Sequence, residues 1–555
     1  MTQSPPLPRP ILTIIHTLLL IGLAWLFFHF VVYGIYAHNL IHFPFDYDQG
    51  EGFELHDVML LSQFKSPYAD IEQYPFYGSI YPPMYHVFLV PFAWLFGAGY
   101  WYGRLFSFIT TLITATLIGW VVYRETYRTI PHADKTLTRL VALASGLAFL
   151  SSNIVYHIGP LFRQHISMFM FETIAIVLLA HVNEIEDTQR RRWVLLIGLG
   201  TLIIAGYTKQ LAAFTAIPAL LFLFIRNPRR AFVWGTGFAV VGVCIFVIFT
   251  ITTDGHWWTQ TITANVKDYL TDQATGLVRL FISLHLALLI PAILQIVYDV
   301  YFDRISIYAL WFGCNVILSA LASGTWGAGD SYYATAISAM CILSGIFISR
   351  TLNRGWQFRK NYASVLVINP LRPLTPMLTI GLMIITPSLY IIYARATLHM
   401  PTTGAVFSQI ADIFDIQPNA DNAFFDSAGR IAGGYADIGH LTTEQDIANG
   451  YAIVARINEV PDDVLILSEE AGFSFATNRE IITNPVVLYI LDQVGAYDST
   501  ELVQMLANQS FGLVILRARF YPPPVNLAID AYYELFEVIH MNGFDYQLLK
   551  PKPMD

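Results

Sequence analysis

The chain has 555 residues and a formal net charge of −9, and 55% of its residues are hydrophobic while 13% are charged. With a mean hydropathy of +0.51, this composition excludes a large soluble protein and indicates a membrane protein with many spans. The negative balance leaves no basic patch of the kind that binds nucleic acid, so we expect no nucleic-acid partner.

Apolar runs long enough to cross a bilayer recur between Ile11 and Tyr393. From about Arg395 the composition becomes that of an ordinary soluble protein. The sequence therefore predicts a polytopic α-helical membrane domain over residues 1–395 and a small soluble α/β domain over residues 396–555. We expect about eleven transmembrane helices, near residues 11–34, 101–123, 140–155, 166–182, 193–207, 211–225, 231–252, 277–299, 306–322, 333–349 and 374–394.

The distribution of basic residues predicts how the chain crosses the membrane. Seventeen Lys and Arg residues fall in one set of connecting segments, and four fall in the other, namely Lys65, Arg163, Lys209 and Lys267. The basic segments of multi-pass proteins face the cytoplasm. This rule places the N-terminus in the cytoplasm and, after an odd number of spans, the C-terminal domain on the outer side.

The apolar run at residues 84–96 does not fit this alternation as a span. It is too short to cross the bilayer comfortably. If it did cross, the basic segment at residues 124–139 would fall on the outer side. We therefore expect a juxtamembrane helix that lies along the outer face, within a first outer loop at residues 37–99.

The first outer loop carries a cluster of acids directly after the first predicted span. The stretch FDYDQGEG (residues 45–52) contains Asp46, Asp48 and Glu51, and the stretch YPPMYH (residues 81–86) follows, with two prolines that fix the entry to the juxtamembrane helix. Acids at a membrane face are often merely solvated. A cluster that faces a helix bundle is nevertheless a candidate site, so we predict that at least one of these carboxylates is functional.

Two further outer loops supply basic groups. The stretch GPLFRQH ends in Arg163 and His165, and GYTKQ carries Lys209 and Gln210 between two predicted helices. Snorkelling of the basic side chains to the interface is the competing interpretation. Together with the acids, these cations predict a general base beside a phosphate-binding site.

The last outer loop, SGTWGAGDSYY (residues 323–333), is rich in glycine and carries Asp330 and Tyr332. Glycines permit irregular backbone at membrane depth where it lines a cavity, although an interfacial aromatic belt would give a similar pattern. Neither HExxH nor CxxC occurs in the sequence. A divalent metal stays open as a cofactor, and its site would have to be built from scattered acids and histidines.

The C-terminal domain shows a different pattern, in which short apolar runs alternate with helical ones. VLILSEE (residues 464–470), EIIT (480–483) and GLVILRA (512–518) are typical of buried strands, and helices are expected near residues 485–494, 500–507 and 526–540. This alternation favours a largely parallel sheet. No GxGxxG or P-loop follows a strand, so nucleotide binding is not expected; covering the membrane site or meeting an acceptor is the favoured role.

The ordered set DQGEG, YPPMYH, RQHIS, TKQLA and GAGDSYY resembles the GT-C glycosyltransferases. This superfamily includes the protein O-mannosyltransferases and the lipid A aminoarabinose transferases, and the chain looks like bacterial members with a C-terminal soluble domain. The resemblance implies a polyprenyl-phosphate sugar as donor and a lipid, glycan or protein as acceptor. It also implies inversion of the anomeric centre, and a place in the plasma (inner) membrane among membrane lipids.

The resemblance further implies roles for individual residues. In such enzymes an acid of the first outer loop is the general base, which by position is Asp48, then Glu51, then Asp46. Arg163 and Lys209 would bind the donor phosphate. The remaining residues expected to contact substrate are Asp46, Tyr81, His86, His165, Gln210, Asp330 and Tyr332.

The chain departs from the family pattern at two places. Gln164 and His165 stand where relatives often carry an acid after the arginine of the second outer loop, and the first loop has DQ in place of DE. These departures leave open the metal dependence and the identity of a second acid.

Two other classes of protein remain as alternatives. A secondary transporter would also have many spans, but its charges usually lie near the midplane in two related halves, whereas here they gather at one face. A non-catalytic scaffold built on the same fold is the second alternative. Sugar transfer that depends on Asp48 would separate an enzyme from both.

Overall fold

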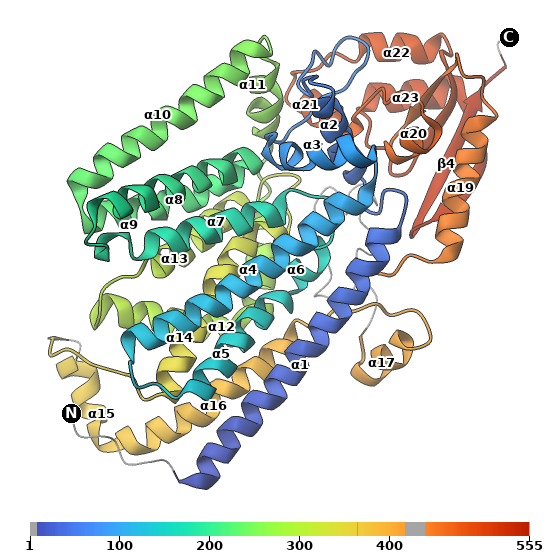
Figure 1. The fold of residues 1–555 in the computed structure, drawn as a ribbon. Coiled ribbons are helices and arrows are strands. Elements are labelled where there is room, and N and C mark those ends of the chain that lie inside the picture. Colours follow the sequence, from blue (N-terminus) through green and yellow to red (C-terminus); the bar gives the residue numbers. More distant parts are fainter. Residues whose placement is uncertain (1–7, 363, 417–438, 554–555) are drawn as a thin grey trace.

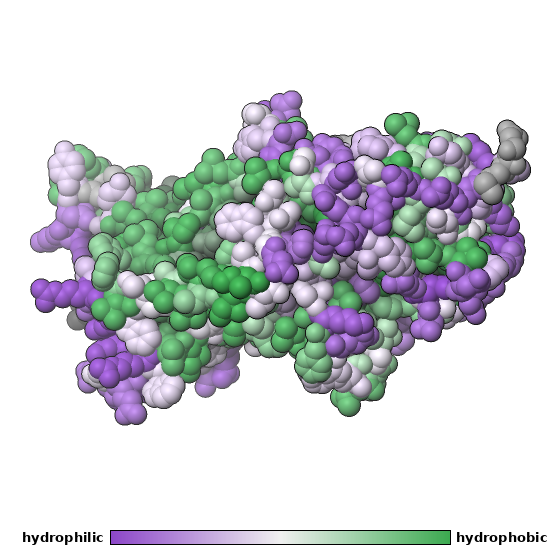
Figure 2. Space-filling model, turned by 90° about the horizontal axis from the view of Figure 1, so that it is seen from above, coloured by the Kyte–Doolittle hydropathy of each residue, from purple (hydrophilic) through white to green (hydrophobic). Residues whose placement is uncertain are grey.

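The computed structural model describes residues 8–362, 364–416 and 439–553. A helical bundle occupies the first two of these ranges, and a small sheet domain packs against one end of it (Figure 1). The first and the last described residues lie at opposite ends of the molecule in this view. Figure 2 shows a hydrophobic surface between two hydrophilic ends, as expected for a bundle that crosses a bilayer.

Each predicted span coincides with a helix. Seven segments of the described chain are long and apolar enough to cross a membrane, and they contain α1, α4, α7, α10, α12, α14 and α16. The predicted spans at α5, α8, α9 and α13 fall short by length or composition, so the number of spans stays a prediction. The bounds are α1 (Arg9–His42), α4 (Tyr100–Thr129), α5 (Lys135–Leu150), α7 (His165–Ala180), α8 (Thr188–Thr208), α9 (Ala213–Arg226), α10 (Pro228–Thr252), α12 (Thr271–Tyr301), α13 (Ile307–Ala322), α14 (Ala334–Leu352) and α16 (Thr375–Ala396).

Helix α14 forms the centre of the bundle. It is buried along nearly its whole length and packs against α4, α5, α12 and α13. Close approach of the neighbouring helices depends on small residues, since a Cβ on Gly146 of α5 would lie 2.6 Å from the carbonyl oxygen of Ala115 on α4. The shorter helices include α6 (Asn153–Ile158), α11 (His256–Thr261), α15 (Asn369–Leu371) and α17 (Phe407–Phe414).

The basic segments gather at the end of the bundle opposite the C-terminal domain, here called the basic end (Figure 1). Arg128 at the end of α4 forms an ion pair of 2.9 Å with Glu184 after α7. Arg226 at the end of α9 donates to the main-chain oxygen of Ile305 before α13 at 2.7 Å. These contacts bring together loops that the charge pattern assigned to one side of the membrane.

The opposite end of the bundle, here called the outer end, carries the first outer loop. Helix α1 continues to His42, and the loop then forms α2 (Glu51–Ser62) and α3 (Met84–Phe96). Helix α3 coincides with the predicted juxtamembrane helix and lies across the end of the bundle, packed against α2 (Figure 1). Its depth in the membrane stays a prediction.

The C-terminal domain has a four-stranded sheet in the order β1-β2-β4-β3. Strands β1 (Leu465–Ser468) and β2 (Phe511–Leu516) are parallel, but β4 (Phe544–Pro551) is antiparallel to both β2 and β3 (Tyr533–Met541). The prediction of a largely parallel sheet is therefore wrong. The surrounding helices are α19 (Glu444–Asn458), α20 (Gly472–Thr477), α21 (Pro485–Gln493), α22 (Thr500–Ala507) and α23 (Pro523–Tyr532).

Two local predictions for this domain also fail. The helix expected over residues 526–540 ends at Tyr532, because the chain then enters β3 and turns at Asn542 and Gly543, both with positive φ (55° and 79°), into β4. A tight turn of this kind joins antiparallel strands into a hairpin. The stretch at residues 480–483 forms only an isolated bridge, between Thr483 and Phe76 of the first outer loop.

Candidate functional site

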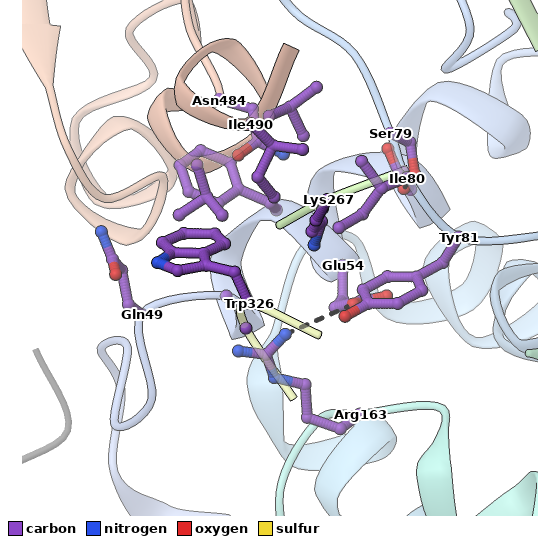
Figure 3. Close-up of a pocket in the computed structure, with 16 residues that line it drawn as sticks. Gln49, Glu54, Ser79, Ile80, Tyr81, Arg163, Lys267, Trp326, Asn484 and Ile490 are labelled. Atoms are coloured by element: carbon purple, nitrogen blue, oxygen red, sulfur yellow. Dashed lines mark hydrogen bonds and ion pairs between the residues drawn. The ribbon is translucent and has the colours of Figure 1, made fainter. Parts of the chain in front are cut away.

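Two adjoining cavities lie between the outer end of the bundle, the first outer loop and the C-terminal domain. The domain-side cavity, of about 110 Å³, is lined by residues such as Gln49, Glu54, Trp326 and Asn484 (Figure 3). The bundle-side cavity, of about 280 Å³, is lined by the residues Asp48, His165, Lys209, Gln210 and Tyr332, among others. Both cavities are lined by Ile80, Tyr81, Arg163, Lys267 and Gly327.

Asp48 is the predicted base, and it is buried at the edge of the bundle-side cavity. Its Oδ2 atom accepts from Arg163, with the Nη2 atom at 2.5 Å and the Nε atom at 2.6 Å. Its Oδ1 atom has no hydrogen-bond partner among the described residues. Burial raises the pKa of Asp48 above its ordinary value, against the opposing charge of Arg163. This carboxylate therefore has a free oxygen and access to a cavity.

Arg163 lies between two carboxylates. Besides its contact with Asp48, its Nη1 atom lies 3.6 Å from the Oε1 atom of Glu54, across the domain-side cavity (Figure 3). The guanidinium packs directly over the backbone of Gly50, where a Cβ would lie 2.2 Å from the Nη2 atom. A glycine at this position thus lets the arginine reach both acids.

Lys209 is nearly fully buried just after the end of α8. Its ammonium group lies 5.1 Å from the centre of the Tyr81 ring and contacts the His165 Nε2 atom. Gln210 fixes this segment, because its side chain donates to the main-chain oxygens of Ile80 at 3.0 Å and Thr261 at 3.3 Å. Lys209 is therefore held at the bundle-side cavity, beside three other residues that the sequence predicted for the site: Tyr81, His165 and Gln210.

The bundle-side cavity gathers three cations from loops far apart in the sequence. Arg163, Lys209 and Lys267 all line it, together with Asp48. Lys267 also lies 5.5 Å from the centre of the Trp326 ring. Three cations around one carboxylate leave an excess of positive charge, which suits an anionic group such as a phosphate.

The last outer loop contributes one of its two predicted residues to this cavity. Tyr332 lines the bundle-side cavity, and its main-chain oxygen accepts from the Ser319 hydroxyl at 2.7 Å. Asp330 is buried in the same short turn but is not among the residues that line either cavity. The structure therefore places Tyr332, and not Asp330, at the cavity wall.

Glu51, the second predicted base, has a different environment from Asp48. Arg104 donates to both of its oxygens at 3.0 and 2.6 Å, and three backbone N–H groups also donate to them. Burial acts to raise the pKa of Glu51, but Arg104 and these hydrogen bonds outweigh it and hold the pKa below its ordinary value. Glu51 lines neither cavity. This environment favours a role in holding the loop.

Asp46 joins the first outer loop to the C-terminal domain. Its carboxylate accepts from the backbone N–H groups of Gly52 at 2.6 Å and Gly472 at 2.9 Å, and from the Tyr100 hydroxyl at 2.7 Å. A Cβ on either glycine would lie within 2.5 Å of an Asp46 oxygen. These contacts favour a structural role for Asp46, which also lines neither cavity.

Sequence reasoning missed two acids of α2. Glu54 and Asp57 line the domain-side cavity, and the predicted residue His86 lies behind them, with its Nε2 atom 2.5 Å from the Glu54 Oε2 atom. Burial raises the pKa of Asp57 to about 6. The available signal was the spacing of three between Glu51, Glu54 and Asp57, which places all three on one side of a helix.

The C-terminal domain forms one wall of the domain-side cavity. Asn484, Val487 and Ile490 of the α21 region line it. The Asn484 side chain also donates to the main-chain oxygen of Gly78 at 3.1 Å. This domain therefore closes one side of the domain-side cavity, and the role expected for it stays a prediction.

No group of three or more His, Cys, Asp or Glu side chains in the described residues is arranged to hold a metal ion. Asp48 and Glu54 are instead bridged by Arg163. The described site therefore pairs its carboxylates with a cation that belongs to the chain itself.

No family model matches the chain, and no curated protein matches it by sequence. Among solved structures, ArnT from Cupriavidus metallidurans in the apo state aligns with a TM-score of 0.55 at 12% identity, over 95% of this chain and 98% of that chain. The same protein bound to undecaprenyl phosphate aligns with a TM-score of 0.53 at 13% identity, over 95% and 97%. These matches show that the chain shares the fold of ArnT.

Proposed function

We propose that this chain is a glycosyltransferase that moves a sugar from a polyprenyl-phosphate donor to an acceptor at the outer face of the membrane. One observation carries the proposal: the buried carboxylate of Asp48 and the cations Arg163, Lys209 and Lys267 line one cavity. That cavity lies in a chain with the fold of ArnT, one of whose structures holds undecaprenyl phosphate. A base beside a phosphate-binding site is the arrangement that such a transfer needs.

The three cations would bind the donor phosphate, which is also the leaving group. As the bond between the anomeric carbon and the phosphate oxygen breaks, the oxygen keeps the electron pair and its negative charge grows. Lys209 and Lys267 are positioned to stabilise that charge within the protein, where fixed donors act more strongly than they do in water. The product is a polyprenyl phosphate.

Asp48 would accept the proton of the acceptor hydroxyl while the acceptor oxygen attacks the anomeric carbon from the opposite face. That attack inverts the centre. In this structure Arg163 holds one oxygen of Asp48. A donor phosphate in the same cavity would compete for Arg163, and the pKa of Asp48 would then rise further because the main charge that opposes burial is drawn away. Donor binding would thus make Asp48 a better base.

The domain-side cavity is the better candidate for the acceptor. It adjoins the bundle-side cavity at Tyr81 and Arg163, and it is covered by α21 of the C-terminal domain. Its wall combines the Trp326 ring with the carboxylates of Glu54 and Asp57. Aromatic faces with nearby hydrogen-bond acceptors suit a hydroxyl-rich lipid or glycan acceptor.

The orientation follows from the basic end. Its charges would face the cytoplasm, and the site and the C-terminal domain would then lie on the outer side of the plasma (inner) membrane. A polyprenyl donor would reach the site from the bilayer, since the bundle-side cavity lies among the ends of membrane helices.

The proposal is tested by incubating the purified full chain in detergent with a panel of radiolabelled polyprenyl-phosphate sugars and a lipid acceptor extract. We expect sugar transfer from at least one donor, and loss of donor affinity in Lys209→Gln by about tenfold or more. Lys65→Gln is the matched control, because Lys65 is an exposed lysine of the first outer loop that lines neither cavity. Absence of both transfer and donor binding across the panel would contradict the proposal.

A further inference from the structure

A third cavity lies at the basic end, on the opposite side of the bundle from Asp48. It has a volume of about 350 Å³ and forms where α4, α7 and α9 end and α13 begins. Its charged and amide-bearing lining residues are Glu125, Arg128, His181, Asn183, Glu184, Arg226, Asp303 and Arg304. Sugar transfer as proposed above uses none of these residues.

Three acids line this cavity, and each lies beside a cation. Asp303 is 4.0 Å from Arg350 and 3.9 Å from Arg359. Arg128 forms ion pairs with Glu125 at 3.0 Å and with Glu184 at 2.9 Å. His181 adds a contact of 2.5 Å between its Nε2 atom and the same Glu125. These carboxylates therefore leave little negative charge to attract a cation from solution.

Two arginines of the same wall keep unused donors. Arg226 makes one hydrogen bond, to the Ile305 main-chain oxygen, and no described residue forms a hydrogen bond or salt bridge with the Arg304 side chain. A guanidinium carries five N–H donors, and its flat geometry matches the oxygens of a phosphate group. Two such groups in one cavity make a site for an anion.

Asn183 adds a neutral donor. Its Oδ1 atom accepts from Arg230 at 2.9 Å, which fixes the orientation of the amide. Among the described residues, the Nδ2 atom is consequently buried without a partner, at a residue that lines the cavity. A buried donor without a partner costs free energy that a bound acceptor would recover.

The remaining walls are apolar and continue onto the membrane surface. Phe222 and Ile307 line the cavity, and the neighbouring α9 residues Phe224 and Ile225 are exposed by 54% and 48%. A headgroup in this cavity could therefore run its acyl chains along α9. Basic pockets between membrane helices on the cytoplasmic side typically bind anionic lipid headgroups.

We propose that this cavity binds the phosphodiester headgroup of an anionic phospholipid, with Arg226, Arg304 and Asn183 as donors to the phosphate. Binding would connect the end of α7, the end of α9 and the start of α13 at the basic end of the bundle. The site is independent of sugar transfer and stands or falls separately from it.

The test measures binding of short-chain phosphatidylglycerol to the delipidated full chain in detergent, for wild type and for Arg226→Gln/Arg304→Gln. We expect the dissociation constant to rise about tenfold or more in this double variant, because two phosphate contacts are lost. The matched control is Arg190→Gln/Arg192→Gln, which removes two charges at the same end, away from the cavity. The control should bind within about twofold of wild type.

Three results would overturn the proposal: equal binding of phosphatidylcholine, unchanged affinity in the double variant, or displacement of the lipid by equimolar inorganic phosphate. The last would assign the cavity to a free anion. Should the double variant fold poorly, Arg304→Gln alone serves, since the Arg304 side chain forms no hydrogen bond or ion pair with a described residue that folding would lose. A single variant with wild-type affinity would contradict the role of Arg304.

Discussion

Two buried ion pairs of the first outer loop differ in how fully the chain satisfies the carboxylate. This difference distinguishes a structural acid from one that can act on a substrate. Glu51 pairs with Arg104, and its two oxygens accept five hydrogen bonds from groups of the chain. Asp48 pairs with Arg163 through one oxygen, has no described partner on the other, and lines a cavity. Both carboxylates are more than nine-tenths buried.

Neither burial nor pairing by itself therefore identifies a functional acid. A carboxylate that the chain satisfies completely has nothing left for a substrate, and breaking its pair costs stability. A carboxylate with a free oxygen at a cavity costs stability to keep and is retained where it can act on a ligand. The Glu51 pair should therefore control folding, and the Asp48 pair should control activity.

The largest effect is expected for Arg104→Leu. Removal of the guanidinium leaves Glu51 buried and unpaired, which should lower the free energy of unfolding by about 3–5 kcal/mol. Thermal and denaturant unfolding in detergent would measure it. A near-wild-type stability would mean that the pair of Glu51 and Arg104 does not hold the loop. It would contradict the division into one pair that controls folding and one that controls activity.

The pH dependence of sugar transfer should depend on the ion pair of Asp48 and Arg163. Asp48 acts only when deprotonated, and burial raises its pKa, so the rate should fall as the pH drops through a value above about 4, the ordinary value for Asp. In Arg163→Gln the opposing charge is lost, and the acidic limb should move upward by about one pH unit or more. A limb that moves downward would show that another group titrates.

Gly50→Ala should weaken the Asp48 pair without touching the Glu51 pair. The added Cβ would lie 2.2 Å from the Arg163 guanidinium, which must then move away from both carboxylates. We expect donor affinity to fall about tenfold, with a melting temperature close to wild type. Gly34→Ala is the matched control, because a Cβ at Gly34 meets no atom within 4 Å.

The smallest effect is expected for Asn484→Ala in the C-terminal domain. The substitution removes one hydrogen bond, to Gly78, and changes one wall of the domain-side cavity. We expect the KM for the acceptor to rise by about threefold to tenfold, as for a single hydrogen bond, while donor affinity stays unchanged. A change in donor affinity instead would assign this cavity to the donor.

The sequence was sufficient for the bundle because each membrane helix is a local signal. The spans predicted from apolar length and from the positions of basic residues each coincide with a helix. The sheet of the C-terminal domain was predicted less well, since β4 lies between β2 and β3 and this pairing depends on contacts between distant segments. The decisive local signal was the pair Asn542–Gly543, which is typical of a hairpin turn and closely follows the stretch predicted as a helix.

The site was predicted in the same uneven way. Asp48, Arg163 and Lys209 were accessible to sequence reasoning because each lies at the outer end of a span, and those ends must meet. The role of Glu51 depended on Arg104, which lies inside a predicted span and was therefore not counted among the loop cations. Glu54 was missed because it lies within α2, beyond the acidic stretch at residues 45–52.

The most direct test compares Asp48→Asn with Glu51→Gln in the same assay of sugar transfer, with the melting temperature measured on the same samples. For Asp48→Asn we predict a rate lower by about 10²–10⁴, as for loss of a general base, and an unchanged or higher melting temperature. For Glu51→Gln we predict a lower melting temperature. Wild-type transfer by Asp48→Asn would contradict the central claim that this carboxylate is the base.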